Sequence, residues 1–149
     1  MARLQRNVVI RAPVERVWRV LIDPERAADW EAGLVAVKDA SGLLDRPDAA
    51  CTQLMNFRGS QLHGELRVIE AYAPHTRLVR VQPPLTSTAL RRERLVATDR
   101  GTQATIELDY ETRGGPLGAV LNVAVTRPRL AMMLAESLRK LRRLAEAEL

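Results

Sequence analysis

The chain has 149 residues and a mass of 16.6 kDa; 46% of the residues are hydrophobic and 28% are charged. A chain of this length suits one domain and buries about 68–70% of its unfolded surface, so it can hold a real core. The composition excludes a disordered chain, a collagen-like repeat and a bundle of membrane helices. We therefore expect residues 1–149 to form a single domain.

The formal net charge is +5, and the basic residues are almost all arginines. A basic chain can bind nucleic acid or an anionic membrane. Nucleic acid is not expected, because the charges are dispersed and the aromatic residues that would form a stacking platform make up only 3% of the chain. The cluster at 139–143 falls in a predicted helix, so a transient contact with an anionic membrane is a further expectation.

Cys51 is the only cysteine, which excludes an intrachain disulfide and a site built from several thiolates. The two histidines, His63 and His75, lack metal-ligand spacing to each other and to Cys51, so neither a metal nor another cofactor is expected. We expect Cys51 to be a buried, inert thiol and His63 to face solvent. No apolar leader and no run of 18 apolar residues is present, which predicts a cytoplasmic protein.

The first 30 residues predict a strand followed by two short helices. The strand covers 4–11 and ends at Ala12-Pro13. Proline suits the first turn of a helix, and the apolar residues that follow have helical spacing, which predicts a helix over 13–22 with Trp18 on its apolar stripe. Asp23-Pro24-Glu25 repeats the start signal and predicts a second helix over 24–30.

From residue 33 to 113 the hydrophobic pattern has a period of two, interrupted by turn residues. Neighbouring strands with such short connections must pair antiparallel. In the last of them apolar and polar side chains alternate, so one face is covered and the other is wet. The predicted strands are 34–38, 51–58, 62–72, 77–82, 89–98 and 102–112.

Residues 117–148 predict one long helix with an apolar stripe that runs from Leu130 to Ala145. Pro128 interrupts this run, so we expect a break or kink near Thr126-Arg127. The helix is the only predicted element large enough to cover the sheet. A cylinder about 10 Å across cannot fill a strongly curved sheet, so a cavity lined mostly by aliphatic side chains is expected between them.

Residues 10–18, with the sequence I-R-A-P-V-E-R-V-W, resemble the I-x-A-P-x-x-x-V-W opening of the START-like (SRPBCC) superfamily. Its members include polyketide cyclases, proteins with the birch-pollen-allergen fold and lipid-transfer domains. The resemblance implies an α+β helix-grip fold, in which a curved antiparallel sheet of about seven strands wraps around the C-terminal helix and a cavity takes a hydrophobic small molecule. Further agreement is found at Asp23-Pro24-Glu25, Trp30, Val68-Ile69-Glu70, Pro74, Gly101-Thr102 and 138–141.

Two functions are compatible with such a cavity. The first is binding or transport of a hydrophobic small molecule, such as a lipid, a polyketide or an isoprenoid-like compound, by a monomer or homodimer without catalytic activity. The second is catalysis of the polyketide cyclase, aromatase or dehydrase type. The fold does not decide between them, because function resides in the site. Converging polar groups with a strongly perturbed pKa would favour catalysis, and a smooth aliphatic wall would favour carriage.

Strand and helix periodicity gives the side chains expected to face the cavity. They are Met55, Phe57, Leu66, Val68, Leu95, Ile106, Leu108, Tyr110, Met133, Leu134 and Leu138.

The candidates for catalysis are Glu70, Glu93, Arg92 and Tyr110. Alternation places both carboxylates inward unless a β-bulge shifts the register and leaves them in solvent, which is the favoured alternative. An inward carboxylate would be desolvated and could act as a general acid or base, or it could pair with an inward arginine from Arg91, Arg92 or Arg94. The Tyr110 hydroxyl could orient a ligand or be satisfied at the rim.

Overall fold

The computed structural model describes residues 2–57, 59–83, 88–111 and 115–147. Seven strands form one antiparallel sheet in the order β1-β7-β6-β5-β4-β3-β2. The sheet is continuous because each strand except β1 pairs with its neighbour in the sequence, and β1 pairs with β7. The strands are β1 (Ala2–Ile10), β2 (Leu34–Lys38), β3 (Ala50–Phe57), β4 (Ser60–Tyr72), β5 (Thr76–Val81), β6 (Ala89–Thr98) and β7 (Gly101–Tyr110).

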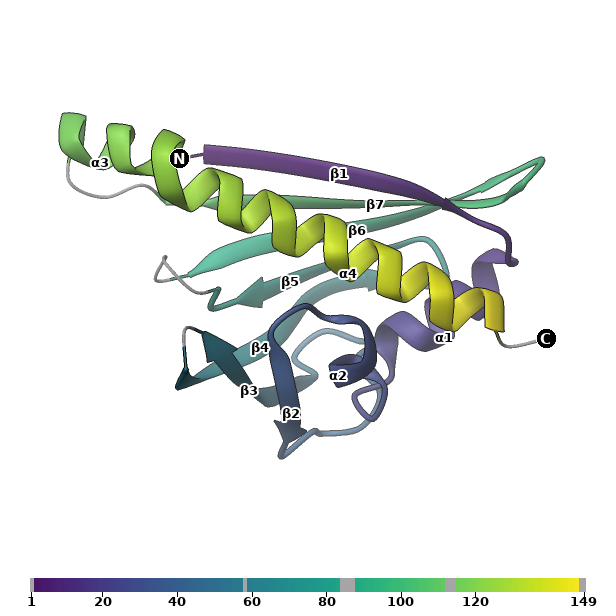
Figure 1. Cartoon of the computed structure of the whole chain (residues 1–149). Helices are drawn as coiled ribbons and strands as arrows, with labels where there is room; N and C mark the ends of the chain where they lie inside the picture. The colour runs from purple at the N-terminus through teal and green to yellow at the C-terminus, as the bar shows by residue number, and fades with distance from the viewer. Residues whose placement is uncertain (1, 58, 84–87, 112–114, 148–149) are drawn as a thin grey trace.

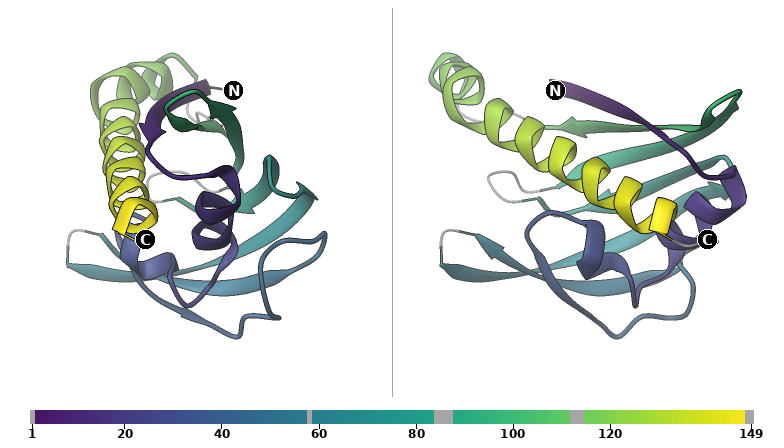
Figure 2. Two further views of the ribbon diagram at one scale, coloured as in Figure 1. Left: turned by 90° about the vertical axis from the view of Figure 1, so that its right-hand side faces the viewer. Right: turned by 45° about the vertical axis from the view of Figure 1, so that its right-hand side comes forward.

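The helices lie on the concave side of this sheet. The short helices α1 (Val14–Ile22) and α2 (Ala27–Trp30) follow β1, and the long helix α4 (Arg127–Ala147) closes the chain. In Figure 1, α4 crosses in front of the sheet, and α1 lies near the C-terminal end of α4. Figure 2 shows the sheet bending around the helix. This arrangement confirms the expected α+β helix-grip fold.

The C-terminal helical run is continuous but changes its winding. It begins with α3 (Gly115–Leu121), widens to a π-helical turn over Asn122–Thr126 and continues as α4. The turn ends just before Pro128, where a break was expected, because proline lacks the amide proton that an α-helical hydrogen bond needs. From there the apolar stripe of α4 is buried against the core; its members are Leu130, Leu134, Leu138, Leu141 and Ala145.

The element bounds differ from the predicted ones mainly at their ends. The strands 34–38 and 89–98 have the predicted bounds. The predicted helix 24–30 is shortened to α2, because residues 24–26 form a turn instead. Residues 58, 112 and 148, which the sequence placed at the ends of elements, lie outside the described ranges.

Gly101 connects the opening of the chain to the sheet. It begins β7 with φ +131°, and a β-carbon built on it would clash with the backbone carbonyl oxygen of Ile10. The next residue, Thr102, donates its hydroxyl proton to the Ala12 carbonyl at 2.7 Å. Only glycine permits this close approach, which gives a physical reason for Gly101-Thr102 in the matching pattern.

The first part of the C-terminal run carries exposed apolar side chains. Leu117 and Val123 are 79% and 70% exposed, and Met132 is 72% exposed. By length and composition alone, Gly115–Ala147 could cross a membrane. One such helix is weak evidence for a membrane span; 22% of its qualifying window is buried, and the apolar stripe of α4 packs against the core.

Candidate functional site

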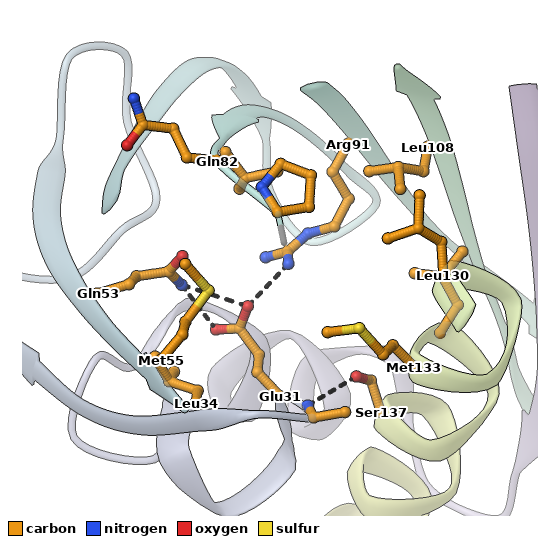
Figure 3. Close-up of a pocket in the computed structure, with 14 residues that line it drawn as sticks. Glu31, Leu34, Gln53, Met55, Gln82, Arg91, Leu108, Leu130, Met133 and Ser137 are labelled. Carbon is orange, nitrogen blue, oxygen red and sulfur yellow. Dashed lines mark hydrogen bonds and ion pairs between the residues drawn. The ribbon is translucent and has the colours of Figure 1, made fainter. Parts of the chain in front are cut away.

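A cavity of about 70 Å³ lies between the concave face of the sheet and the first half of α4 (Figure 3). Nine apolar residues line its wall, and seven of them come from β2, β3, β5, β7 and α4. The nine are Ala32, Leu34, Met55, Val81, Pro83, Leu108, Leu130, Met133 and Leu134. The polar part of the wall consists of Glu31, Gln53, Gln82, Arg91 and Ser137.

The cavity lies at the end of the fold where α4 begins, because α1 fills the end where α4 finishes. Trp18 and the apolar residues around it on α1 are buried in the same core cluster as Leu138 and Leu141 of α4. Within the described part of the chain, α1 lies near the C-terminal end of α4 (Figure 1), whereas the first half of α4 faces the cavity. The connection after α2 closes the side, where the Ala32 amide donates to Ser137 Oγ at 2.9 Å.

A wider, open groove lies outside the cavity. Its volume is about 580 Å³, and it runs between the start of β2, the end of β3 and the start of α4. Two residues, Ala32 and Met133, line both hollows. The Met133 Cε atom lies 3.6 Å from the position that a β-carbon would take on Gly33. The methyl group of Met133 therefore packs next to Gly33, which has no side chain. Ala32 and Met133 thus form the wall that the inner cavity and the groove share.

Four charged side chains form a buried cluster beside the cavity. Arg77 on β5 and Glu93 on β6 are opposite each other in the register, and both are 1% exposed. Arg77 donates to Glu93 through Nε and through Nη2, the latter at 3.0 Å, and its Nη1 donates to the Leu44 carbonyl at 3.0 Å. Arg91 then bridges two carboxylates, with Nε 3.1 Å from Glu93 Oε2 and Nη1 2.7 Å from Glu31 Oε1. The two positive and two negative charges balance.

The cluster fixes the ionisation of its members. Burial alone would raise the pKa of Glu93, but the guanidinium groups of Arg77 and Arg91 outweigh it and hold the pKa below its ordinary value. Burial alone would lower the pKa of Arg91, but Glu31 and Glu93 outweigh it and raise the pKa. Glu93 is thus a permanent anion at neutral pH, and its oxygen atoms are already engaged.

Donor groups in and beside the cluster remain without acceptors. Arg91 Nη2 and Trp30 Nε1 are buried and have no hydrogen-bond partner within the described residues. The Arg91 guanidinium also lies 5.7 Å from the centre of the Trp30 ring. Figure 3 shows this guanidinium directed into the cavity. A buried N–H without a partner is costly, so Arg91 Nη2 favours an acceptor placed in the cavity.

The structure distributes the residues expected at the cavity over three places. Met55, Leu108, Met133 and Leu134 line the inner cavity. Phe57 lines the outer groove instead, where Arg129 lies 5.5 Å from its ring centre. The others are packed in the core away from both hollows, since inward strand parity also points toward α1 and the second half of α4; they are Leu66, Val68, Leu95, Ile106, Tyr110 and Leu138.

The four residues considered as candidates for catalysis also lie in different parts of the structure. Glu70 is exposed, because the register shifts between Val68 and Glu70 and turns it away from the core. Arg92 is exposed on the outer face of β6. The Tyr110 hydroxyl donates to Asn122 Oδ1 at 2.6 Å and does not line the cavity. Glu93 points inward, as its parity indicates. The favoured alternative, in which a β-bulge leaves the carboxylate in solvent, was therefore wrong for this residue.

Sequence reasoning missed five members of the polar site, namely Glu31, Gln53, Arg77, Gln82 and Ser137. Arg77 shares the inward parity of Val79 and Val81, so alternation could have placed it in the core. Glu31 and Gln53 had weaker signals. Glu31 directly follows Trp30 in a connection without periodicity, and Gln53 is one polar residue in an alternating strand, where it contacts Glu31 only at 3.4–3.5 Å.

Cys51 is buried, as the sequence predicted. Burial and the nearby Glu31 carboxylate raise the pKa of this thiol to about 11. Because the thiolate is the reactive form, we expect Cys51 in the folded protein to react with a thiol reagent at pH 8 about 100-fold or more slowly than in the unfolded chain. Ellman's reagent with and without guanidinium measures this ratio, and equal rates would contradict the burial of Cys51.

The fold and its partly polar cavity define a helix-grip protein with an interior site. The chain belongs to the family described as polyketide cyclase / dehydrase and lipid transport, whose pattern matches residues 1–146. The START-like resemblance seen in the sequence is thereby confirmed. No curated protein matches the chain in sequence.

Solved structures share the fold at low sequence identity. Protein CV1439 from Chromobacterium violaceum is 19% identical, with a TM-score of 0.76, over 99% of this chain and all of that one. The di-domain ARO/CYC BexL from the BE-7585A biosynthetic pathway is 18% identical, with a TM-score of 0.76, over 99% of this chain and 51% of that one. Ara h 8.0201 is 9% identical, with a TM-score of 0.70, over 97% of each chain.

Proposed function

We propose that this protein binds a hydrophobic small molecule between the sheet and the first half of α4. The observation that carries the proposal is the interior cavity, whose wall is mostly apolar and continues toward an open groove. Mostly apolar hollows with a few placed polar groups are the usual sites for small molecules. The family description, which includes lipid transport, supports the same class of ligand.

A cyclase is the second candidate function, and one observation favours it. Glu31, Gln53, Arg91 and Ser137 converge on one cavity, and the similar protein BexL is an ARO/CYC protein. The state of the carboxylates favours binding instead. Both face arginine, and a general acid needs a raised pKa whereas the pKa of Glu93 is lowered. The polar groups are therefore better suited to hold a ligand than to exchange protons with it.

Three further expectations stay predictions from the sequence. Arg139, Arg142 and Arg143 are exposed on α4, as a contact with an anionic membrane requires. The choice between monomer and homodimer and the cytoplasmic location likewise remain to be measured.

The proposal predicts that a neutral solvatochromic dye binds the protein at about one molecule per chain. Titration with Nile red should saturate near this ratio with a shift of its emission to shorter wavelength, because the dye leaves water for an apolar wall. Leu134→Trp should weaken binding at least tenfold, since the dye needs both the cavity and the adjoining groove and the larger side chain fills the cavity that Leu134 lines. Circular dichroism checks that the variant is folded.

Leu117→Trp is the matched control, because Leu117 is exposed on α3 and lines neither hollow. Leu108→Trp fills the cavity from the opposite wall and gives an independent second variant. Unchanged dye affinity in both folded cavity variants would place the dye elsewhere and overturn the proposal.

A further inference from the structure

We infer that the inner cavity and the outer groove are two parts of one elongated site, divided by Met133, and that the inner part holds a neutral hydrogen-bond acceptor at the end of an aliphatic ligand. This inference rests on the proposed function and names the ligand class: a long-chain ketone, ester or related molecule with an uncharged oxygen at one end. Arg91 and Ser137 would hold that oxygen, and Met133 would control entry.

The volumes require both hollows. Sites for small molecules usually measure about 300–1,000 Å³. The inner cavity of about 70 Å³ holds only a small group, whereas the groove of about 580 Å³ holds a chain but is open to solvent. They share Ala32 and Met133 as wall. A methionine side chain is unbranched and flexible, so rotation of Met133 can join the two hollows without moving the backbone.

The inner end offers donors more readily than acceptors. Arg91 Nη2 is buried without a partner in the described part of the chain, and it belongs to a side chain that is 11% exposed. Ser137 Oγ accepts the Ala32 amide, which leaves the hydroxyl proton free to be donated. Glu31 Oε1 and Glu93 Oε2 are engaged by Arg91. Both Glu93 oxygens also contact Arg77, and Glu31 Oε2 lies 3.5 Å from Gln53 Nε2.

The charge balance selects an uncharged oxygen. Arg77 and Arg91 carry two positive charges, and Glu31 and Glu93 carry two negative ones, all within one buried network. A ligand carboxylate would add an unbalanced negative charge to this network, and burying an unpaired charge is costly. A carbonyl oxygen accepts the same hydrogen bonds without that cost.

The groove favours an aliphatic chain. Its apolar lining includes Ala124, Val125, Pro128, Met132 and Met133 from the π-helical turn and the start of α4, with Phe57 from β3; Asn56, Arg129 and Glu136 are the polar residues of the lining. A chain that starts at Arg91 and passes Met133 would thus leave the inner cavity along an apolar wall.

The test uses 2-tridecanone with a ¹³C-labelled carbonyl as the probe. Isotope-edited infrared spectra of the bound ketone report directly on hydrogen bonding to its oxygen. We expect the carbonyl band of the complex to lie at lower wavenumber than in a hydrocarbon solvent. Arg91→Lys keeps the positive charge that Glu31 and Glu93 need but removes the planar guanidinium, so it should move the band back toward the hydrocarbon value.

Affinity gives a second readout of the same contact. Arg91→Lys should weaken ketone binding about tenfold or more, as expected for a hydrogen bond to a charged group, and Ser137→Ala about two- to tenfold. Binding of n-tridecane should change little in either variant, because it has no oxygen. Arg92→Lys is the matched control on the outer face of β6, and it should alter neither ligand.

The division by Met133 is tested through rates. Met133→Ala should raise the association and dissociation rates of the ketone about tenfold, because it shortens the side chain that separates the two hollows. Leu117→Ala is the control: Leu117 is 79% exposed on α3 and lines neither hollow, so the rates should stay unchanged.

The outcomes separate this inference from the proposed function. If Nile red binds in the cavity but the bound ketone shows the hydrocarbon band, the proposed function stands and the polar end is wrong. If dodecanoate binds more tightly than the ketone at pH 8, the ligand end is anionic and the uncharged class is wrong. Equal rates for Met133→Ala and Leu117→Ala overturn the division. If neither dye nor ketone binds, the proposed function fails.

Discussion

Glu93→Gln is expected to lower the free energy of unfolding by about 3–5 kcal/mol, the range for breaking a buried ion pair by removing one partner. Glutamine keeps the volume of glutamate but removes the charge, so packing is preserved. Arg77 is 1% exposed and would be left without its carboxylate, while Arg91 would keep only Glu31. Urea denaturation at pH 7 measures the loss.

The matched control is Glu70→Gln on β4, two strands away from β6 in the sheet, where the side chain is exposed. We expect a change within about 0.5 kcal/mol there, as for most surface substitutions. Comparable stability of wild type and Glu93→Gln would contradict the buried network.

The pH dependence of the same variant follows from the direction of the pKa. The pKa of Glu93 is lowered in the folded protein from an ordinary value of 4.5, because Arg77 and Arg91 outweigh the effect of burial. The unfolded chain therefore binds the proton more readily than the folded one. This contribution to stability is fully present above about pH 4.5 and is lost as the pH falls through the lower folded value. The difference between wild type and Glu93→Gln should shrink over that acidic range.

The sequence predicted the fold well because its signals are local. Alternating apolar residues marked the strands, and the strand 89–98 was placed with the bounds that β6 has. Proline and the apolar stripe placed the C-terminal helix and its change of winding before Pro128. Each of these features depends on residues close together in the chain, which is why periodicity was sufficient.

The polar site could be predicted only in part because its contacts are not local. Parity placed Glu93 inward, but its partner Arg77 lies on another strand, and only the register of β5 and β6 brings the two together. Parity alone would place Glu70 inward, and the favoured alternative, a bulge that leaves it in solvent, is confirmed for this residue. The position of the cavity depends on which inward side chains α1 covers, so Leu108 lines it while Ile106, two residues earlier on β7, does not.

The second large effect is expected at Trp18, which lies on α1 and is 5% exposed. Trp18→Ala should cost about 3–5 kcal/mol, since truncation of a large core side chain loses both its burial and the packing around it. For a chain of this size that loss lowers the melting temperature by roughly 6–20 °C. Thermal unfolding followed by circular dichroism measures the shift.

Tyr72→Ala is the matched control for Trp18→Ala, because Tyr72 is also aromatic but is 65% exposed on β4, and its melting temperature should hardly change. The two variants also test how the interior is divided. Since α1 fills the end of the fold opposite the cavity, folded Trp18→Ala should still bind Nile red at about one molecule per chain. An unchanged melting temperature would refute the assignment of the α1 stripe to the core. A second dye per chain in Trp18→Ala alone would mean that the ligand space extends beneath α1.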